Sequence, residues 1–267
     1  MFITFLTDFG LEDDFVGTCH GVIKRIAPDV EIIDVTHGIS PQSILQGALV
    51  LANTLPFLPE GVHLAVVDPG VGSGRRALAL GGQNGRVFVG PDNGLLVPAA
   101  EALGGIDVAH EIANREYALD HVSSTFHGRD IFAPAAAHLA RGVEIAELGP
   151  EVEPDSLVRL ELPTPDLTER RIRATCLYVD RFGNIQLNLN RGHLEQYGIE
   201  PGRLVELEHM GDRYYASAAK TFADARPGEV ILYEDAYENV ALAISRGNAA
   251  ETFNVSAGAE IRIRRAE

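Results

Sequence analysis

The sequence predicts two domains: an α/β domain with a mixed, largely parallel sheet flanked by helices, followed by an all-β barrel. Apolar runs alternate with amphipathic helices over residues 1–68, whereas short alternating runs between Gly, Pro and Asn turns fill residues 171–267. The intervening residues 148–170 hold four prolines and little periodicity. We therefore expect an N-terminal domain at residues 1–160, a linker at residues 161–170 and the barrel after it.

The first domain opens with an apolar run at residues 2–6, which predicts a buried strand. A helix is expected next, because Asp13 or Asp14 can cap it and Pro28 ends it. A second strand follows at residues 31–36. The apolar positions that share one face of the helix are Phe15, Cys19, Val22, Ile23 and Ile26.

A second helix is expected to start at Ser40, before a proline, and residues 63–68 form a third strand. This βαβαβ order is typical of sheets whose ligands bind beyond the carboxyl ends of the strands. Asp8, His37 and Asp68 all lie at such ends. The order therefore predicts a ligand-binding site at the carboxyl ends of these strands.

Antiparallel strands then join the sheet. Residues 76–80 and 86–90 flank Gln83-Asn84-Gly85, a strong hairpin signal. An alanine-rich helix is expected at residues 130–141, with Pro134 in its first turn, where a missing N–H does no harm.

The second domain contains short strands and one helix near residues 193–197. The runs expected to be strands are residues 172–179, 204–208, 213–218, 229–233, 240–244 and 260–263. Their number and spacing predict a small barrel or sandwich of roughly 100 residues.

Composition excludes several classes of protein. The chain has 267 residues and a formal net charge of −16, which argues against binding nucleic acid or an anionic membrane. No apolar stretch approaches the roughly 20 residues that cross a bilayer, and the first residues lack the basic segment of a secretory signal. We therefore expect a cytoplasmic protein with no nucleic-acid or membrane partner.

The most informative motif runs from Val67 to Arg76. It carries Asp68 at a strand end, three glycines that allow tight turns, and two adjacent arginines, Arg75 and Arg76. It is not a phosphate-binding Walker loop, because it lacks the Gly-Lys-Ser/Thr ending and precedes a strand. Taken alone, it could equally be a glycine-rich turn with surface arginines.

Two further motifs are weaker individually. His127 lies between an aromatic residue and a glycine just before a helix, where histidines are often surface or capping residues. Asp180 and Asn184 bracket a Phe-Gly turn, which a hairpin alone explains. A metal site could be assembled from Asp8, His37, Asp68 and His127. No His-x-His or similar spacing supports it, so we expect no metal.

Taken in order, the motifs resemble one family, the S-adenosylmethionine (SAM) hydroxide adenosyltransferases. These adenosine-forming SAM hydrolases are related to the SAM-dependent fluorinase and chlorinase. The segments that carry the resemblance are Phe-Leu-Thr-Asp-Phe-Gly (5–10), Asp-Val-Thr-His (34–37), Val-Asp-Pro-Gly-Val-Gly (67–72), Gly-Pro-Asp-Asn-Gly-Leu-Leu (90–96), Thr-Phe-His-Gly-Arg-Asp (125–130), Asp-Arg-Phe-Gly-Asn (180–184) and Ser-Arg-Gly-Asn-Ala (245–249).

The resemblance implies that water or hydroxide attacks the ribose C5′ of SAM and releases adenosine and L-methionine. It implies a homotrimer in which SAM lies between one subunit's N-terminal domain and its neighbour's C-terminal domain, and no cofactor. The family's catalytic triad falls on Asp68, Arg75 and His127.

The resemblance also assigns substrate contacts. Asp8 matches the acid that holds the ribose hydroxyls. Asp180 and Asn184 match residues that contact the methionine amino group and the adenine. Asn248 and Ala249 match the segment that closes over the adenine.

Three details qualify this assignment. The halogenating relatives have other residues at the positions of Asp68 and His127, which points to water as the nucleophile. Ala236 stands where relatives commonly have a serine near the methionine. Arg75 weakens a neighbouring carboxylate as a base, so either Asp68 activates the water or Arg75 stabilises hydroxide directly. The alternatives are a metal-dependent hydrolase of a nucleoside-type substrate and a non-catalytic SAM- or adenosine-binding protein.

Overall fold

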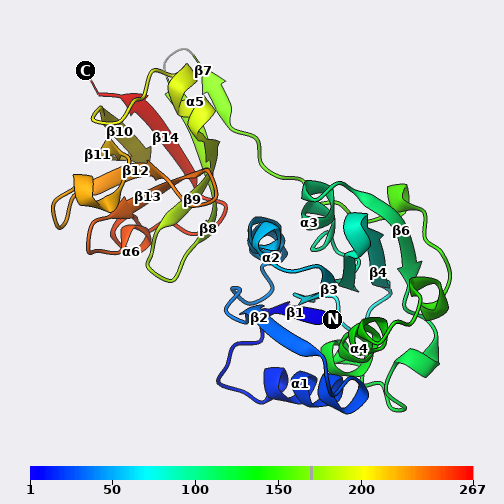
Figure 1. Cartoon of the computed structure of the whole chain (residues 1–267). Helices are drawn as coiled ribbons and strands as arrows, with labels where there is room; N and C mark the ends of the chain where they lie inside the picture. The colour runs from blue at the N-terminus through cyan, green and yellow to red at the C-terminus, as the bar shows by residue number, and fades with distance from the viewer. Residues whose placement is uncertain (169–170, 267) are drawn as a thin grey trace. The chain divides into compact units, whose positions relative to one another are not determined.

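A computed structural model describes residues 1–168 and 171–266 of the chain. The chain divides into two compact units, Met1–Leu160 and Glu161–Glu267 (Figure 1). Residues 169 and 170 of the expected linker, and residue 267 at the end of the expected barrel, lie outside the described residues. Within the two described ranges, every helix is too short or too polar to cross a membrane.

A six-stranded sheet forms the centre of the first unit, in the order β2-β1-β3-β5-β4-β6. Its strands are β1 (Phe2–Thr7), β2 (Glu31–Thr36), β3 (Gly61–Val66), β4 (Ala77–Gly82), β5 (Val87–Pro91) and β6 (Ile106–Glu111). Strand β4 pairs antiparallel with β5 and β6, and the pairs of β1 with β2 and β3, and of β3 with β5, are parallel. The expected mixed, largely parallel sheet is confirmed.

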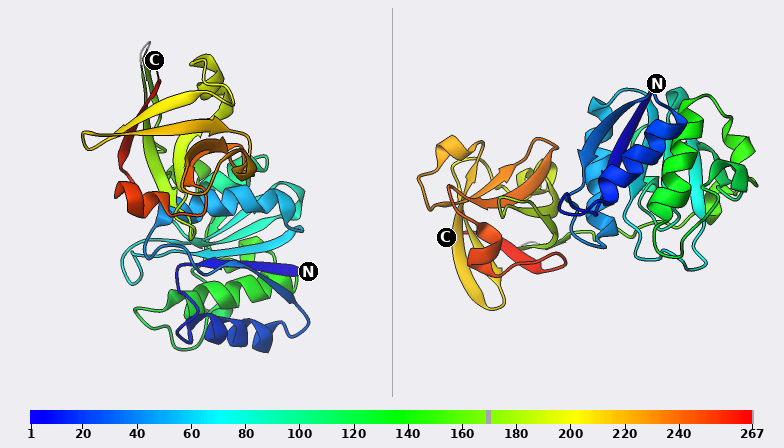
Figure 2. Two further views of the ribbon diagram at one scale, coloured as in Figure 1. Left: turned by 90° about the vertical axis from the view of Figure 1, so that its left-hand side faces the viewer. Right: turned by 90° about the horizontal axis from the view of Figure 1, so that it is seen from below.

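Helices cover both faces of this sheet (Figures 1 and 2). On one face lie α1 (Phe15–Ile26) and α4 (Ala133–Ala140), and on the other lie α2 (Ile44–Thr54) and α3 (Val97–Ala102). Strand β3 is buried along its whole length because both of its faces are covered. Leu64 packs into the core beneath α1 and α4, and Ala65 packs into the core beneath α2 and α3. Such two-sided burial explains why every position of β3 except His63 is apolar or glycine.

The second unit is a closed barrel of seven strands, with β7 added beside β8. The strands are β7 (Asp166–Thr168), β8 (Arg171–Val179), β9 (Ile185–Asn190), β10 (Leu204–His209), β11 (Asp212–Ala219), β12 (Val230–Glu234), β13 (Asn239–Ile244) and β14 (Glu260–Arg265). Pairing of β14 with both β10 and β8 closes the ring, so no seam is left between the barrel's first and last strands. The predicted barrel is confirmed.

Two short helices accompany the barrel, α5 (Arg191–Gln196) and α6 (Ala249–Phe253). Ala249 and Phe253 of α6 pack into the barrel core. Single turns of 3₁₀ helix lie at Leu55–Phe57, Gln83–Gly85, Arg115–Tyr117, Ile145–Leu148, Pro154–Ser156 and Phe222–Asp224.

Most predicted elements form, and several details differ. Strand β3 spans Gly61–Val66 instead of residues 63–68, and the helix expected at residues 130–141 is α4, preceded by a π-helical turn at Gly128–Phe132. Helix α2 starts at Ile44 instead of Ser40, because Gln42 adopts a left-handed conformation with φ of 65°. Phe15 is 40% exposed, and Val16 takes its place among the buried positions of α1. Pro134 occupies the first turn of α4, as expected.

Candidate active site

The fold brings two carboxylates to one edge of the sheet. Asp8 follows β1, and Asp68 lies two residues beyond β3, whose Val66 pairs with Thr7 of β1. Strand order reverses at β1, with β2 on one side and β3 on the other. In open α/β sheets, ligands bind outside the carboxyl ends of the strands at such a reversal.

Asp68 and Arg75 form a buried, two-pronged ion pair. Arg75 Nε donates to Asp68 Oδ1 at 2.9 Å and to Oδ2 at 3.1 Å, and Arg75 Nη2 also donates to Oδ2. The side chains are only 6% and 10% exposed, respectively. Planar pairing through two donors fixes the carboxylate's orientation as well as its charge.

The same guanidinium holds His127. Arg75 Nη2 lies 3.0 Å from His127 Nδ1. Arginine has only donors, so Nδ1 must accept and the neutral imidazole carries its proton on Nε2. Burial and then the charge of Arg75 lower the pKa of His127, and Asp68 opposes them in part. At neutral pH, His127 can therefore donate through Nε2 but has no free lone pair with which to act as a base.

An aromatic ring also packs against the guanidinium group of Arg75. The guanidinium carbon of Arg75 lies 4.9 Å from the ring centroid of Phe132, a cation–π arrangement. Phe132 ends a π-helical turn, Gly128–Phe132, that leads into α4. Such turns are frequent at functional sites, and this one directly follows His127.

Close packing of two loops brings Arg75 to His127. Gly72, with φ of 76°, lies so near Ser124 that a Cβ atom would stand 2.3 Å from the Ser124 carbonyl oxygen. Only glycine therefore allows this approach. In the loop that precedes His127, the backbone N–H of Ser123 donates to Oδ2 of the fully buried Asp130 at 2.8 Å.

Arg76, the second arginine of the motif, has a different role. Its Nε donates to Asp92 Oδ2 at 2.8 Å and its Nη2 to the Ser156 carbonyl oxygen at 2.7 Å. Asp92 also accepts from the backbone N–H of Val158 at 2.9 Å. Arg76 thus fastens the end of the first unit onto the sheet and does not face Asp68.

Asp8 is held at the sheet edge by one hydrogen bond, which Gln42 N donates to Asp8 Oδ2 at 2.7 Å. The bond explains why Gln42 leaves the helical conformation and why α2 starts late. Among the residues that the structure describes, none donates a hydrogen bond to the other carboxylate oxygen, Oδ1. Asp8 thus retains acceptor capacity for a ligand.

In the second unit, Asp180 and Asn184 form the turn between β8 and β9. Asp180 Oδ1 accepts from the backbone N–H groups of Phe182 at 2.8 Å and Asn184 at 2.9 Å. Asp180 Oδ2 accepts from Asn184 Nδ2 at 2.7 Å. The turn therefore presets both side chains.

Asn248 and Ala249 lie against that turn, although they are distant in sequence. The backbone N–H of Ala250 donates to the Gly183 carbonyl oxygen at 3.0 Å. Asn248 caps α6 by accepting from Glu251 N at 3.0 Å, and Ala249 is fully buried. All four residues expected to bind substrate in this unit are thus neighbours.

Sequence reasoning missed the supporting residue Asn93. Its Nδ2 donates to the Val67 carbonyl oxygen at 2.8 Å and fixes the chain just before Asp68. The signal was its place in Gly-Pro-Asp-Asn-Gly-Leu-Leu, one of the segments that carry the family resemblance.

The metal grouping considered from the sequence does not form. Asp68 and His127 are bound to the cationic Arg75, which repels a metal ion, and His37 lies with His20 and Asp34 instead. Asp68, Arg75 and His127 are therefore joined to one another by hydrogen bonds and an ion pair.

Known proteins and protein-family models match this sequence over nearly its whole length. The model of the SAM hydroxide adenosyltransferase N-terminal domain matches residues 3–149, and that of the C-terminal domain matches residues 174–262. The chain is 47% identical to the (R)-S-adenosyl-L-methionine hydrolase of Salinispora arenicola, over 98% of this chain and 97% of that protein.

More distant similarities also extend over nearly the whole chain. Identity with a fluorinase of an Actinoplanes species is 30%, over 99% of this chain and 97% of that protein. The crystal structure of an uncharacterized conserved protein from Thermotoga maritima matches with a TM-score of 0.90 at 37% identity, covering 98% of this chain and 100% of that chain. Both domain models and these full-length similarities show that the chain belongs to the SAM hydroxide adenosyltransferase family.

Proposed function

We propose that the protein hydrolyses S-adenosyl-L-methionine to adenosine and L-methionine by attack of water or hydroxide at the ribose C5′. The observation that carries this proposal is the Asp68–Arg75–His127 group at the sheet edge, in a chain 47% identical to a protein named (R)-S-adenosyl-L-methionine hydrolase. That name specifies the (R) form, so we propose the (R) epimer at sulfur as substrate.

The reaction needs catalysis mainly of the attack by water, and little at the leaving group. A nucleophile displaces sulfur in line at C5′, and the sulfonium departs as a neutral thioether that no acid must protonate. Asp68 is the group with lone pairs to accept a proton from water, since His127 Nδ1 already accepts from Arg75. We assign Asp68 as the base, a role worth roughly 10²–10⁴-fold in rate.

Arg75 and His127 position that base and the water. Arg75 holds the carboxylate plane, and His127, whose ring also hydrogen-bonds to the Ser123 backbone, can turn its Nε2–H toward the oxygen of the attacking water. Direct stabilisation of hydroxide by Arg75 is the alternative, and it requires Asp68 only as a counterion.

Substrate contacts are proposed from the family resemblance. Asp8 accepts hydrogen bonds from the ribose hydroxyls. Asp180 and Asn184 bind the methionine amino group and the adenine, and Asn248 and Ala249 close over the adenine. The unused acceptor capacity of Asp8 and the preset turn at Asp180 support these roles.

We also propose a cytoplasmic homotrimer in which the first unit of one subunit and the second unit of its neighbour bind the same SAM molecule, without a cofactor. Support comes from the division of the expected contacts between the two units of the chain. Light scattering coupled to size-exclusion chromatography measures the oligomeric state directly.

Incubation with each sulfonium epimer of SAM, followed by chromatography, tests the reaction. We expect adenosine and L-methionine in equal amounts, no halogenated nucleoside when fluoride or chloride is present, and activity that persists in EDTA. Loss of activity in EDTA would support a metal-dependent hydrolase, and retention of intact SAM would support a binding protein.

The variant Asp68→Ala tests whether Asp68 is needed for the reaction or only for binding SAM. We expect adenosine formation to fall by at least about a hundredfold while calorimetry still detects SAM binding. Unchanged turnover in this variant would rule out Asp68 as the base.

A further inference from the structure

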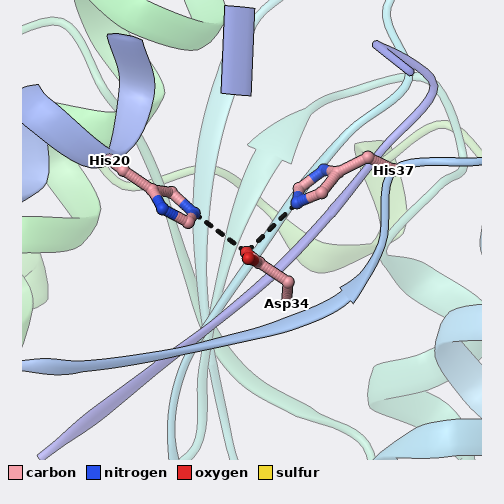
Figure 3. Close-up of side chains that lie close together, drawn as sticks. All are labelled: His20, Asp34 and His37. Atoms are coloured by element: carbon pink, nitrogen blue, oxygen red, sulfur yellow. Dashed lines mark hydrogen bonds and ion pairs between the residues drawn. The ribbon is translucent and has the colours of Figure 1, made fainter. Parts of the chain in front are cut away.

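Outside the Asp68 group, three metal-binding side chains converge at the edge of the same sheet. His20 comes from α1, Asp34 from β2, and His37 directly follows β2; Figure 3 shows both imidazoles pointing a ring nitrogen at the carboxylate. His20 Nε2 lies 2.9 Å from Asp34 Oδ1, and His37 Nε2 lies 3.1 Å from the same oxygen. The three donor atoms all stand within 4.8 Å of one another.

One of the three ligand atoms is buried and faces the carboxylate. The His37 side chain is 3% exposed, and its Nε2 lies 3.1 Å from Asp34 Oδ1. Its other nitrogen, Nδ1, is 2.8 Å from Thr7 Oγ1. Histidines that bind metals commonly have this arrangement, with one nitrogen toward the ion and the other toward a hydrogen-bonding group.

The three side chains are covered by Phe5 on one side and open to solvent on the other. Phe5 is fully buried, and its ring centroid lies 4.9 Å from that of His37 and 5.9 Å from that of His20. On the open side, the side chains of His20 and Asp34 are 31% and 42% exposed. An ion could therefore enter from solvent and keep water in its remaining positions.

We propose that His20, Asp34 and His37 bind a divalent transition-metal ion such as Zn²⁺, through both Nε2 atoms and Asp34 Oδ1. Ligands about 2.0–2.1 Å from a tetrahedral zinc ion stand roughly 3.3 Å from one another, so each distance from an imidazole nitrogen to Asp34 Oδ1 needs to lengthen by only a few tenths of an ångström. Two imidazoles and one carboxylate select such ions over Mg²⁺ and Ca²⁺.

The bound ion joins α1 and β2 to the loop after β1. Thr7, which contacts His37, directly precedes Asp8, and the backbone N–H of Gly10 donates to the His37 carbonyl oxygen at 2.8 Å. Metal binding therefore stabilises this corner of the first unit. The ion takes no part in the reaction, because Asp68 and His127 are held by Arg75.

Titration of the full-length chain, freed of any histidine tag and treated with EDTA, tests the site. Added Co²⁺ should give visible absorption bands that saturate at one ion per chain, and Zn²⁺ should abolish them. Zn²⁺ should also raise Tm by several degrees, since the ion binds the folded state.

The variants His20→Ala and Asp34→Asn should lose the Co²⁺ bands and the Tm shift, and circular dichroism should confirm that they fold. His121→Ala removes an exposed histidine of the same unit and should bind like the wild type. No bands in the wild type, or equal bands in Asp34→Asn, would overturn the proposal. Adenosine formation is measured separately, so its absence bears only on the proposed function.

Discussion

At the residue scale, Arg75 organises the candidate active site. It contacts Asp68, His127 and Phe132 with a single planar group. A planar guanidinium can donate to two partners and stack on a ring at once, whereas an ammonium acts as a point charge.

Replacement Arg75→Lys tests this geometry while keeping the charge. We expect kcat to fall by about tenfold to a hundredfold with SAM affinity largely retained, because lysine cannot orient Asp68 and His127 together. Steady-state kinetics and calorimetry measure the two effects. The exposed Arg115→Lys serves as a control, and a wild-type kcat in Arg75→Lys would contradict the assigned role.

His63 is a second residue whose environment fixes its protonation. It is fully buried, with Nδ1 2.9 Å from Thr4 Oγ1 and Nε2 3.3 Å from Arg86 Nη1. Because Arg86 can only donate, Nε2 accepts and Nδ1 carries the proton. Burial, followed by the charge of Arg86, lowers the pKa of His63 from 6.5 to about 4.

This shift predicts acid sensitivity with a definite sign. The unfolded chain takes up a proton at His63 below about pH 6.5 and the folded chain only near pH 4, so stability falls as the pH falls between these values. The loss by about pH 5 is about 2 kcal/mol. Denaturant unfolding of the wild type and His63→Gln at both ends of this window measures it. Equal pH dependence in the two proteins would be contrary evidence.

At the element scale, loop packing decides the site. The loop after β3 reaches His127 only because Gly72 lies against Ser124. The sequence predicted the existence and order of β1, β2 and β3, since buried strands are encoded by local apolar runs, but it placed β3 two residues too late. It placed the start of α2 too early, because a long-range hydrogen bond from Gln42 to Asp8 overrides the local Ser-Pro signal.

The substitution Gly72→Ala tests the loop contact. A Cβ there meets backbone at 2.3 Å and a positive φ disfavours alanine, so we expect a loss of about 1–3 kcal/mol in stability and at least about a tenfold lower kcat. Gly74→Ala is the matched control, as no atom lies within 4 Å of its added Cβ. Thermal unfolding and kinetics compare the two. If both variants behave alike, the Gly72 contact is unimportant.

At the scale of the whole molecule, expected substrate contacts are divided between the two units. The first unit supplies Asp8 and the Asp68 group, and the second supplies the turn at Asp180 with Asn248 and Ala249. The proposed trimer explains why one chain contains both sets.

Mixing two impaired variants tests whether subunits share a site. Asp68→Ala impairs the first unit, and Asp180→Asn removes the charge expected to bind the amino group while keeping a turn-forming side chain. In a randomly assembled trimer with shared sites, about a quarter of the sites regain both intact halves. Adenosine formation after co-refolding should therefore exceed that of either variant alone. No gain would mean that each chain builds its own site.

The sequence by itself determined the α/β architecture, the barrel and the family, because periodicity and ordered motifs are local properties that survive without coordinates. Only the tertiary structure decided that Arg76 binds Asp92 and Ser156, which nitrogen of His127 accepts, and that His20 meets Asp34 and His37. These are contacts between loops and elements far apart in the chain. Local patterns do not specify them, since they depend on how the sheet and its helices bring distant segments together.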